Sequence, residues 1–277
     1  MKTKKQFGQH WLRNEQVLDK IVKAAHISST DRILEIGPGT GILTRRLIPA
    51  AGAVLAVEID RDLSALLVKK LGNVDNFLLL EHDFLTLDLA STLTQFPKFQ
   101  NTNKVVANIP YNITGPILEK LLGNILHPSP QPFDSIVLLV QKEVAERLYA
   151  KPSTKAFGAL SIRVQYLAHC ELICPVPARD FSPPPKVDSA VVRLTPRKLA
   201  LTADNPKLLD NLVRLGFSTR RKMLRNNLQS AIDRDALSEL LMSQNISTET
   251  RAEDLSLEQW IQLSNLVNST SKSTVES

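Results

Sequence analysis

The sequence predicts an α/β protein that contains a doubly wound, mainly parallel sheet and ends in a small all-α domain. Through the first two thirds of the chain, short apolar, β-branched runs alternate with helical apolar spacing, which is typical of successive βαβ units. After about Pro196 the strand pattern stops and helical spacing alone remains. With 277 residues, 43% of them hydrophobic, the chain can bury a core of this size.

Seven strands are expected, because each is a short apolar run bounded by turn or polar residues. The runs are Arg32–Gly37, Val54–Asp60, Phe77–Asp83, Lys104–Pro110, Ser135–Val140, Glu171–Val176 and Ser189–Thr195. Helical spacing between them predicts the helices Leu43–Ala51, Asp62–Gly72, Gly115–Leu122 and Lys142–Ala150. Ligands of such sheets bind at the carboxyl ends of the strands, so we expect the chemistry there.

The last third of the chain predicts helices. Asn205–Ile232 and Asp235–Val267 have helical spacing, and Pro206 stands where a helix begins. The polar end of the chain has few apolar residues with which to pack. We therefore expect a first domain of residues 1–200, a helical domain of residues 201–268 and a flexible tail of residues 269–277.

The charge of the chain indicates a polyanionic partner. Its formal net charge is +6. Residues 1–30 carry six Lys or Arg against two acids, and residues 211–230 carry five and no acid. Such clusters are typical of nucleic-acid binding, although a solubilising face explains any single cluster equally well.

Other features of the composition indicate a cytoplasmic protein without a membrane partner. No apolar run approaches the roughly 20 residues that span a bilayer, and the basic N-terminus precedes no apolar region. Cys170 and Cys174 form no disulfide framework and fit a reducing compartment. His169 lies beside them, but a structural zinc needs four ligands, so we expect buried cysteines and no metal.

Polar residues follow the first three strands. The first strand runs into Glu35–Gly41, "EIGPGTG", whose glycines let a ligand approach the backbone. Glu58 ends the second strand, where an acid meets ribose hydroxyls in nucleotide-binding folds, and Asp83 ends the third, where an acid can accept from an adenine amino group. A ligand-free turn or solvated strand ends would explain each feature alone. Three successive strands with suitable ends favour an adenosine site.

The fourth strand ends on Asn108-Ile109-Pro110-Tyr111 instead of an ordinary turn. An amino group conjugated to an adenine ring is a poor nucleophile. Asn108 can accept one of its hydrogens, and the rigid backbone around Pro110 can offer a carbonyl to the other, which favours the positive charge that develops during methyl transfer. Tyr111 can stack on a flipped-out base. These residues favour S-adenosylmethionine over NAD as the adenosine-containing cofactor.

Four motifs together resemble one family. "QFGQHWL", "EIGPGTG", "NIPY" and "FSPPPKVDSAVVRL" are similar to those of the bacterial small-subunit (16S) ribosomal RNA adenine N6,N6-dimethyltransferases, the KsgA/RsmA family, and the likeness extends to "FSTRRKMLRNNL". The resemblance implies a Rossmann-like methyltransferase fold, S-adenosylmethionine as cofactor, and two adjacent adenosines near the 3′ end of 16S rRNA as substrate. The rRNA would be presented in the small subunit or its precursor, and we expect a monomer.

The resemblance also implies site residues. The cofactor contacts would be His10, Leu12, Gly37, Glu58, Asp83 and Asn108, and the catalytic residues Asn108, Pro110, Tyr111 and Phe181. The family often has Asn where this chain has His10. Without the resemblance, Phe181 would be read as a core residue beside a proline-rich loop. No metal is implied.

Ser218–Leu228 is read as an rRNA-contacting helical segment. Arg221, Lys222 and Arg225 have a spacing that would place them on one helix face. Three other functions remain open: a large-subunit rRNA methyltransferase of the antibiotic-resistance type, a ribosome-assembly or transcription factor that does not need catalysis, and an NAD oxidoreductase. The PKVDSAVVRL and TRRKMLRNNL stretches argue against the first, the intact NIPY motif against the second, and the lack of any hydride-transfer signature against the third.

Overall fold

The computed structural model describes residues 9–273, with the backbone alone for residues 271–273. The basic residues Lys2, Lys4 and Lys5 and the start of the QFGQHWL motif therefore lie outside the described residues. Contacts divide the chain into two compact units. The sheet unit comprises Met1–Leu122, Ser129–Ala145 and Cys170–Pro196, and the helical unit comprises Gly123–Pro128, Glu146–His169 and Arg197–Ser277.

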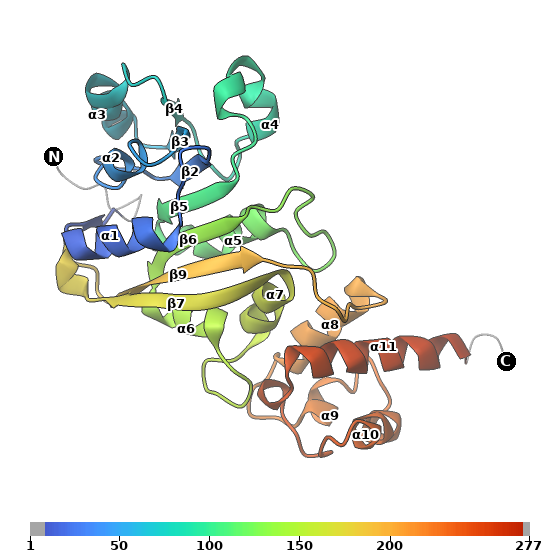
Figure 1. Ribbon diagram of the computed structural model, residues 1–277. Helices are drawn as coiled ribbons and strands as arrows, with labels where there is room; N and C mark the ends of the chain where they lie inside the picture. Colours follow the sequence, from blue (N-terminus) through green and yellow to red (C-terminus); the bar gives the residue numbers. More distant parts are fainter. Residues whose placement is uncertain (1–8, 274–277) are drawn as a thin grey trace. The chain divides into compact units, whose positions relative to one another are not determined.

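The sheet unit is built on a seven-stranded sheet with the order β4-β3-β2-β5-β6-β9-β7 (Figure 1). The strands are β2 (Arg32–Ile36), β3 (Ala53–Glu58), β4 (Phe77–Glu81), β5 (Lys104–Asn108), β6 (Ser135–Gln141), β7 (Ala168–Val176) and β9 (Ser189–Pro196). β2 pairs in parallel with β3 and β5, β3 with β4, and β5 with β6, whereas β9 runs antiparallel to β6. The expected mainly parallel sheet is confirmed.

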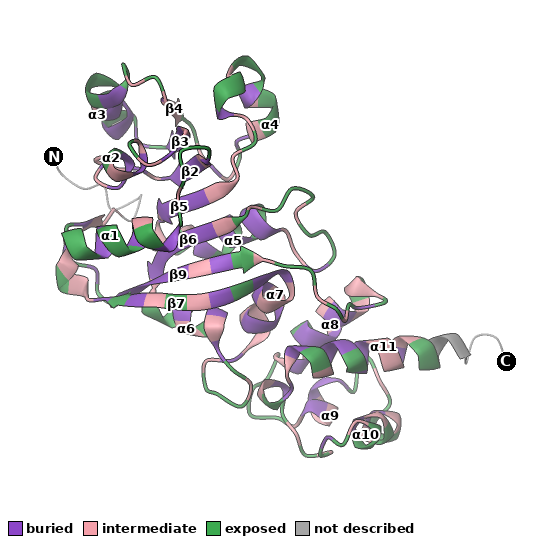
Figure 2. Ribbon diagram, in the orientation of Figure 1, coloured by how far each residue is buried: buried purple, intermediate pink, exposed green. Residues whose placement is uncertain are grey.

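The strands in the middle of the sheet are buried on both faces (Figure 2). All six residues of β3 are buried, and so are the five central residues of β6. A strand of this kind has no polar face, which is why it appears in the sequence as a continuous run of Val, Leu, Ile and Ala.

Helices and short segments connect these strands. They are α1 (Glu15–Ala24), α2 (Thr44–Leu47), α3 (Arg61–Leu71), α4 (Leu89–Thr92), α5 (Thr114–Leu122) and α6 (Lys142–Tyr149), with 3₁₀ turns at Leu93–Gln95, Pro97–Phe99, Tyr111–Ile113 and Ala178–Asp180. α1, which was not predicted, packs against β6 (Figure 1) and begins at Asn14, whose side chain accepts from the backbone N–H of Gln16 and Val17. A second sheet pairs β1 (Trp11–Leu12) with β8 (Phe181–Ser182).

β2 is the strand at which the order of strand addition reverses. From β2 the chain order proceeds outward through β3 and β4 on one side, and through β5 and β6 on the other. The loops that leave β2 and β5 therefore diverge, which opens a crevice at their carboxyl ends. This topology places the residues after β2, β3, β4 and β5 around one site.

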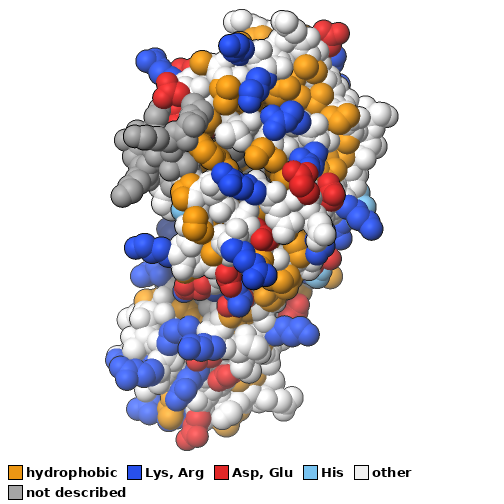
Figure 3. All heavy atoms as spheres, turned by 90° about the vertical axis from the view of Figure 1, so that its left-hand side faces the viewer, with side chains coloured by type: hydrophobic (Ala, Val, Ile, Leu, Met, Phe, Trp, Pro, Cys, Tyr) orange, Lys and Arg blue, Asp and Glu red, His pale blue; other side chains and the backbone are white. Residues whose placement is uncertain are grey.

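The helical unit contains α7 (Ala159–Leu167), α8 (Pro206–Gly216), α9 (Leu224–Asn227), α10 (Arg234–Ser243) and α11 (Leu257–Ser273), with a 3₁₀ turn at Ala252–Asp254. Its core surrounds Trp260, which is fully buried. Gly216 lets α8 approach this ring, because a Cβ there would lie 2.5 Å from the indole. Lys and Arg side chains group over this unit in the lower part of Figure 3.

The two long helices expected after residue 204 are broken in the structure, so that expectation was wrong. The side-chain amide of Asn227 donates to the carbonyl oxygens of Gly216 (2.6 Å) and Thr219 (3.0 Å), which holds residues 217–223 in turns after α8. The backbone N–H of Leu224 donates to Thr250 O (2.8 Å). Ser218–Leu228 is therefore a turn followed by the four-residue α9, not one helix, and its basic residues do not share a helix face.

The C-terminal boundaries also differ from the expected ones. α11 continues to Ser273, five residues into the expected tail, and the hydroxyls of Ser269 and Thr270 donate to Leu266 O within the helix. Residues 274–277 lie outside the described part of the chain. Contacts group Glu146–His169 with the C-terminal helices. The expected division into domains of residues 1–200 and 201–268 stays a prediction about which parts of the chain fold independently.

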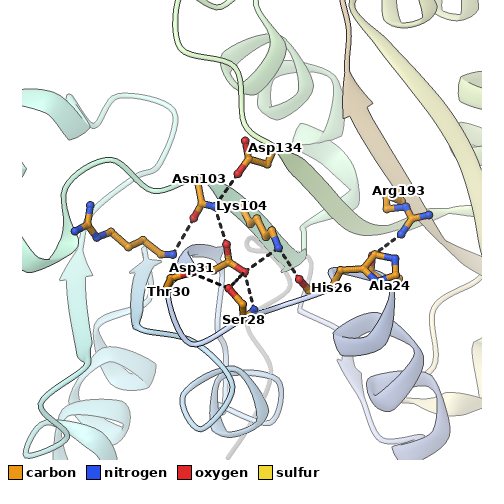
Figure 4. A network of polar contacts seen from close by, with 10 residues as sticks. Ala24, His26, Ser28, Thr30, Asp31, Asn103, Lys104, Asp134 and Arg193 are labelled. Carbon is orange, nitrogen blue, oxygen red and sulfur yellow. Dashed lines mark hydrogen bonds and ion pairs between the residues drawn. The ribbon is translucent and has the colours of Figure 1, made fainter.

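A polar network joins the amino ends of β2, β5 and β6 (Figure 4). Asp31 accepts from Lys104 Nζ (2.8 Å), Asn103 Nδ2 (2.7 Å) and the Ser28 backbone (2.6 Å), and Asn103 also donates to Asp134. Burial acts to raise the pKa of Asp31, but these hydrogen bonds outweigh it and lower that pKa to about 2. The network lies at the end of the strands opposite to the crevice and has a structural role.

No helix among residues 9–273 combines the length and apolar character needed to cross a bilayer.

Candidate active site

A cavity of about 330 Å³ lies at the carboxyl ends of β2 to β5 in the sheet unit. The sequence-predicted site residues that line it are His10, Leu12, Gly37, Glu58, Asp83, Asn108, Pro110 and Tyr111. Residues separated by up to about a hundred positions in the chain thus meet around one space, as the strand-end pattern predicted. Phe181 is the one predicted residue that does not line the cavity.

The glycine loop after β2 forms one wall. Gly37 has φ +67° and Gly39 has φ +61°, a left-handed conformation that side chains rarely adopt. A Cβ at Gly37 would lie 3.9 Å from Asn108 O and from Pro110 Cδ, and one at Gly39 would lie 3.5 Å from the Trp11 ring. The loop therefore passes close to both the NIPY motif and the N-terminal segment.

Glu58 ends β3 and fastens this loop. Its Oε2 accepts from the backbone N–H of Gly39 and its Oε1 from that of Asp60, both at 3.0 Å. Burial raises the pKa of Glu58, and these two hydrogen bonds oppose that rise by stabilising the charged form. Each carboxylate oxygen retains a further lone pair, so the group can still accept from hydroxyls in the cavity.

Asp83 lies in the turn after β4, where its Oδ1 accepts from the backbone N–H of Leu85 (2.9 Å). Lys120, from α5, fixes the same turn: its Nζ donates to Leu85 O (3.1 Å) and Leu87 O (2.6 Å) and lies 5.0 Å above the Phe84 ring. The sequence alone did not identify Lys120, because a lysine on a helix more than 30 residues away carries no signal of this contact.

Asn108 ends β5 with its amide oriented by the N-terminal segment. Its Nδ2 donates to His10 O (3.2 Å), so its Oδ1 is available to accept from another group. The His10 ring stacks on Tyr111, with 6.0 Å between the centroids and 18° between the planes, and its Nδ1 is 2.9 Å from Pro183 O. His10 therefore contacts two of the predicted catalytic residues, Asn108 and Tyr111, and also the segment that carries Phe181.

Tyr111 is held at its hydroxyl as well. Its oxygen lies 2.5 Å from Ser189 Oγ, and Ser189 is fully buried. Burial raises the pKa of Tyr111, and the hydrogen bond to Ser189 opposes the rise. The phenol thus stays neutral near pH 7 and serves as a fixed aromatic surface.

Phe181 has a different place in the structure. It lies in β8, opposite Leu12 of β1, and is 3% exposed within the core of the sheet unit. The described structure gives it the core position that the sequence suggests without the family resemblance. Its contact with a target base stays a prediction.

Glu35 also lines the cavity, although the sequence analysis assigned it no role. It is 1% exposed, and its Oε2 has no hydrogen-bond partner among the described residues. Burial raises the pKa of Glu35 to about 8, with a smaller contribution from the negative charge of Glu58. The protonated form of this carboxyl can both donate and accept a hydrogen bond.

These groups fit the expected S-adenosylmethionine. Glu58 retains acceptors for ribose hydroxyls, Asp83 can accept from an adenine amino group, and the glycine loop leaves room for close approach of a ligand to the backbone. The unpartnered oxygen of Glu35 adds a polar group to the same cavity. No group of three or more His, Cys, Asp or Glu side chains in the described part of the chain is arranged as a metal site.

Sequence comparison relates almost the whole chain to one family. The family model for ribosomal RNA adenine dimethylase matches residues 1–269. A protein named ribosomal RNA small subunit methyltransferase A from Trichormus variabilis is 69% identical over 94% of this chain and 96% of its own length. Its namesake from Synechocystis is 57% identical over 95% and 96%.

Solved structures give the same relationship. A dimethyladenosine transferase from Plasmodium falciparum is 30% identical, with a TM-score of 0.78, and the match covers 95% of this chain and 98% of that one. The 23S rRNA methyltransferase ErmE is 25% identical, with a TM-score of 0.73, and the match covers 93% and 99%. Both likenesses extend over the sheet unit and the helical unit.

Proposed function

The chain belongs to the ribosomal RNA adenine dimethylase family, and from this premise we propose that it methylates two adjacent adenosines near the 3′ end of 16S rRNA. As a member of this family it is an S-adenosylmethionine-dependent rRNA adenine N6-dimethyltransferase with a Rossmann-like fold. The choice of the small-subunit rRNA rests on the relatives named small subunit methyltransferase A. The rRNA would be presented in the small subunit or its precursor.

The cofactor, when bound, supplies a methyl group activated by a positively charged sulfur. Glu58 would hold its ribose and Asp83 its adenine amino group, while His10, Leu12, Gly37 and Asn108 contribute the other predicted contacts. The support for these assignments is that all six residues line one cavity.

Asn108 would act on the acceptor amine. With Nδ2 held on His10 O, its Oδ1 can accept one hydrogen of the adenine amino group, and a backbone carbonyl near Pro110 can accept the other. Two fixed acceptors favour the positive charge that develops on the nitrogen during transfer. The orientation of the Asn108 amide is the single observation that carries this mechanism.

Tyr111 would stack on the flipped-out adenine. Its ring lines the cavity beside Asn108, and its hydroxyl is already bonded to Ser189. The phenol would therefore contact the base by stacking, and its hydroxyl would not bond to the base. Phe181 is buried, so a contact with the base from the other side would require exposure of β8.

The helical unit would supply an rRNA-contacting surface. Arg220 donates to Lys155 O (2.7 Å) and Phe157 O (3.1 Å), which fastens the loop at residues 151–157 to the turn at residues 218–222. This contact joins the loop that carries the exposed cations Lys151 and Lys155 to the turn that carries the exposed Arg221 and Lys222. Arg225 is half-buried and donates to Met223 Sδ (3.5 Å), so we leave it out of this surface.

We further propose a monomer that acts in the cytoplasm. Both cysteines are free and buried, which fits a reducing compartment.

Methylation of defined ribosomal particles tests the proposal. The protein would be incubated with labelled S-adenosylmethionine and unmethylated small subunits, naked 16S rRNA or naked 23S rRNA, and the labelled bases mapped by mass spectrometry. We expect two dimethylated adenosines near the 3′ end of 16S rRNA. Label confined to 23S rRNA would instead assign the activity to the large subunit.

A further inference from the structure

The ring of Tyr111 is held by two residues that lie outside the NIPY motif. Its hydroxyl oxygen is 2.5 Å from Ser189 Oγ, and its face stacks on the imidazole of His10. Ser189 follows Tyr111 by 78 residues, and His10 precedes it by 101. Neither contact is a consequence of local chain geometry, so both depend on the fold.

Ser189 is a rigid anchor. It is the first residue of β9, pairs with Gln141 of β6, and has 0% exposure. Because β9 lies between β6 and β7, its backbone cannot shift without disturbing both neighbours. A buried hydroxyl needs a partner, and Tyr111 provides it here. The oxygen end of the phenol is thereby fixed to the sheet.

His10 is held from three directions. Its Nδ1 lies 2.9 Å from Pro183 O, its own carbonyl accepts from Asn108 Nδ2, and its ring lies on Tyr111. Pairing of β1 with β8 runs directly beside this residue and sets its position relative to Pro183. One face of the phenol is therefore covered by the imidazole.

These contacts set the plane of the Tyr111 ring before the substrate arrives. A tyrosine ring without such contacts has a broad range of χ2 angles. Transfer to an aromatic amine requires the nitrogen to lie in line with the methyl group, and small misplacements reduce the rate strongly. The contacts with Ser189 and His10 thus hold the Tyr111 ring in one orientation.

We infer that Ser189 and His10 are positioning residues of the methyl transfer, which orient Tyr111 so that the target adenine stacks in a reactive geometry. This inference rests on the proposed role of Tyr111 as the stacking surface for the base. Neither residue needs to touch the reacting nitrogen. Ser189 acts through the hydroxyl of Tyr111, and His10 acts through the face of the same ring.

A double-mutant cycle on Ser189 and Tyr111 tests the first contact. Single-turnover methylation would be measured at saturating S-adenosylmethionine for Ser189→Ala, Tyr111→Phe and the double variant. We expect each single change to slow transfer by about 10- to 100-fold, and the double variant to be no slower than the slower single one. A merely structural serine would reduce the rate of the Tyr111→Phe protein further, so losses that multiply would overturn the inference.

His10→Phe and His10→Ala test the second contact. Phe keeps an aromatic ring on Tyr111 but loses the bond to Pro183, whereas Ala loses both. We expect transfer by His10→Phe to be several-fold slower than the parent and by His10→Ala to be slower still, when each is saturated with cofactor. Equal rates for these two variants, or a parental rate for Ala, would contradict a role for the stacked ring.

Ser264→Ala is the matched control, because it removes an equally buried hydroxyl from α11 of the helical unit. It should keep the parental rate. Binding of S-adenosylhomocysteine by calorimetry reports whether each Ser189 variant retains a folded cavity. All rates are measured on whichever rRNA the parent methylates, so a change of target corrects the proposed function and leaves this test intact. A parent that methylates no rRNA would contradict both.

Discussion

At the scale of single residues, the two ends of the Asn108 amide have different roles. Its nitrogen is committed to the His10 carbonyl, and the oxygen is thereby aimed away from the N-terminal segment. An amide without that bond could rotate and offer either end to the amine. The backbone of residue 10 therefore leaves the acceptor end of Asn108 for other groups, as its proposed role requires.

Replacing Asn108 with Ala should reduce turnover by roughly 10²–10³-fold, the usual effect of removing one preorganised polar group from a reacting centre. Because Asn108 is also a predicted cofactor contact, the single-turnover rate must be measured at saturating S-adenosylmethionine. Asn103→Ala, which removes an amide from the residue just before the opposite end of β5, should retain far more activity once the protein is folded. A near-parental rate for the Asn108 variant would exclude its catalytic role.

Glu58→Ala and Asp83→Ala should each weaken binding of S-adenosylhomocysteine, by roughly 1–3 kcal/mol per lost hydrogen-bonding group. The Glu58 change should have the larger effect, because that carboxylate also holds the Gly39 backbone. Calorimetry measures both affinities. Glu81→Ala removes a partly exposed acid, paired with Arg61, from the end of β4 and serves as the control. Parental affinity in both test variants would remove these residues from the cofactor site.

The sequence could predict the site residues at the ends of strands, because the carboxyl ends of parallel strands lie at the same edge of the sheet. Gly37, Glu58, Asp83 and Asn108 are of this kind. Ser189 and Lys120 are ordinary residue types whose contacts arise only from the pairing of β6 with β9 and the position of α5. Ser189 lies in a motif of the family resemblance, but neither its contact with Tyr111 nor the contacts of Lys120 have a signature in one sequence.

At the scale of elements, the accuracy of prediction follows the strength of each local signal. β2 to β6 were predicted to within two residues at each end, because buried parallel strands form continuous apolar runs. The two-residue strands β1 and β8 were not predicted, since two residues carry no periodicity. The helix α7 was not predicted either. The predicted helix at Asn205–Ile232 failed where a side chain, Asn227, binds the carbonyls that would have continued α8.

The Asp31 network at the amino ends of β2, β5 and β6 predicts a pH dependence of stability. The folded pKa of Asp31 is about 2, below its ordinary value of 3.8, so its contribution to stability is present above pH 4 and is lost between about pH 4 and pH 2. Asp31→Asn should lower the free energy of unfolding of the sheet unit by about 2 kcal/mol at pH 7. The difference from the parent should disappear over the same acidic range.

Hydrogen exchange of peptides from β2 and β5, measured across this pH range, reports on the sheet unit alone. Asp75→Asn changes an exposed acid in the loop before β4 and should follow the parent. A difference between Asp31→Asn and the parent that stays constant from pH 7 to pH 2 would show that the charge of Asp31 does not stabilise the network.

At the scale of the whole molecule, the proposed cofactor contacts and the proposed rRNA-contacting cations lie in different units. Every predicted cofactor contact belongs to the sheet unit, whereas Lys151, Lys155, Arg221 and Lys222 belong to the helical unit. Recognition of rRNA and binding of the cofactor should therefore be separable by mutation. The net charge of +6 favours association with rRNA in general, but a defined surface is needed to place one adenosine at the cavity.

Replacing Arg221 and Lys222 with Gln should weaken binding to unmethylated small subunits and reduce its salt dependence, by up to about two slope units for two lost phosphate contacts, because fewer counterions are released. Affinity for S-adenosylhomocysteine should not change. The control replaces Lys207 and Arg214 of α8 with Gln, which removes the same charge from two other exposed positions of the helical unit. Affinity measured at several salt concentrations separates the possibilities: equal slopes in both double variants would attribute the effect to net charge, and a parental slope for Arg221 and Lys222 would remove them from the rRNA contact.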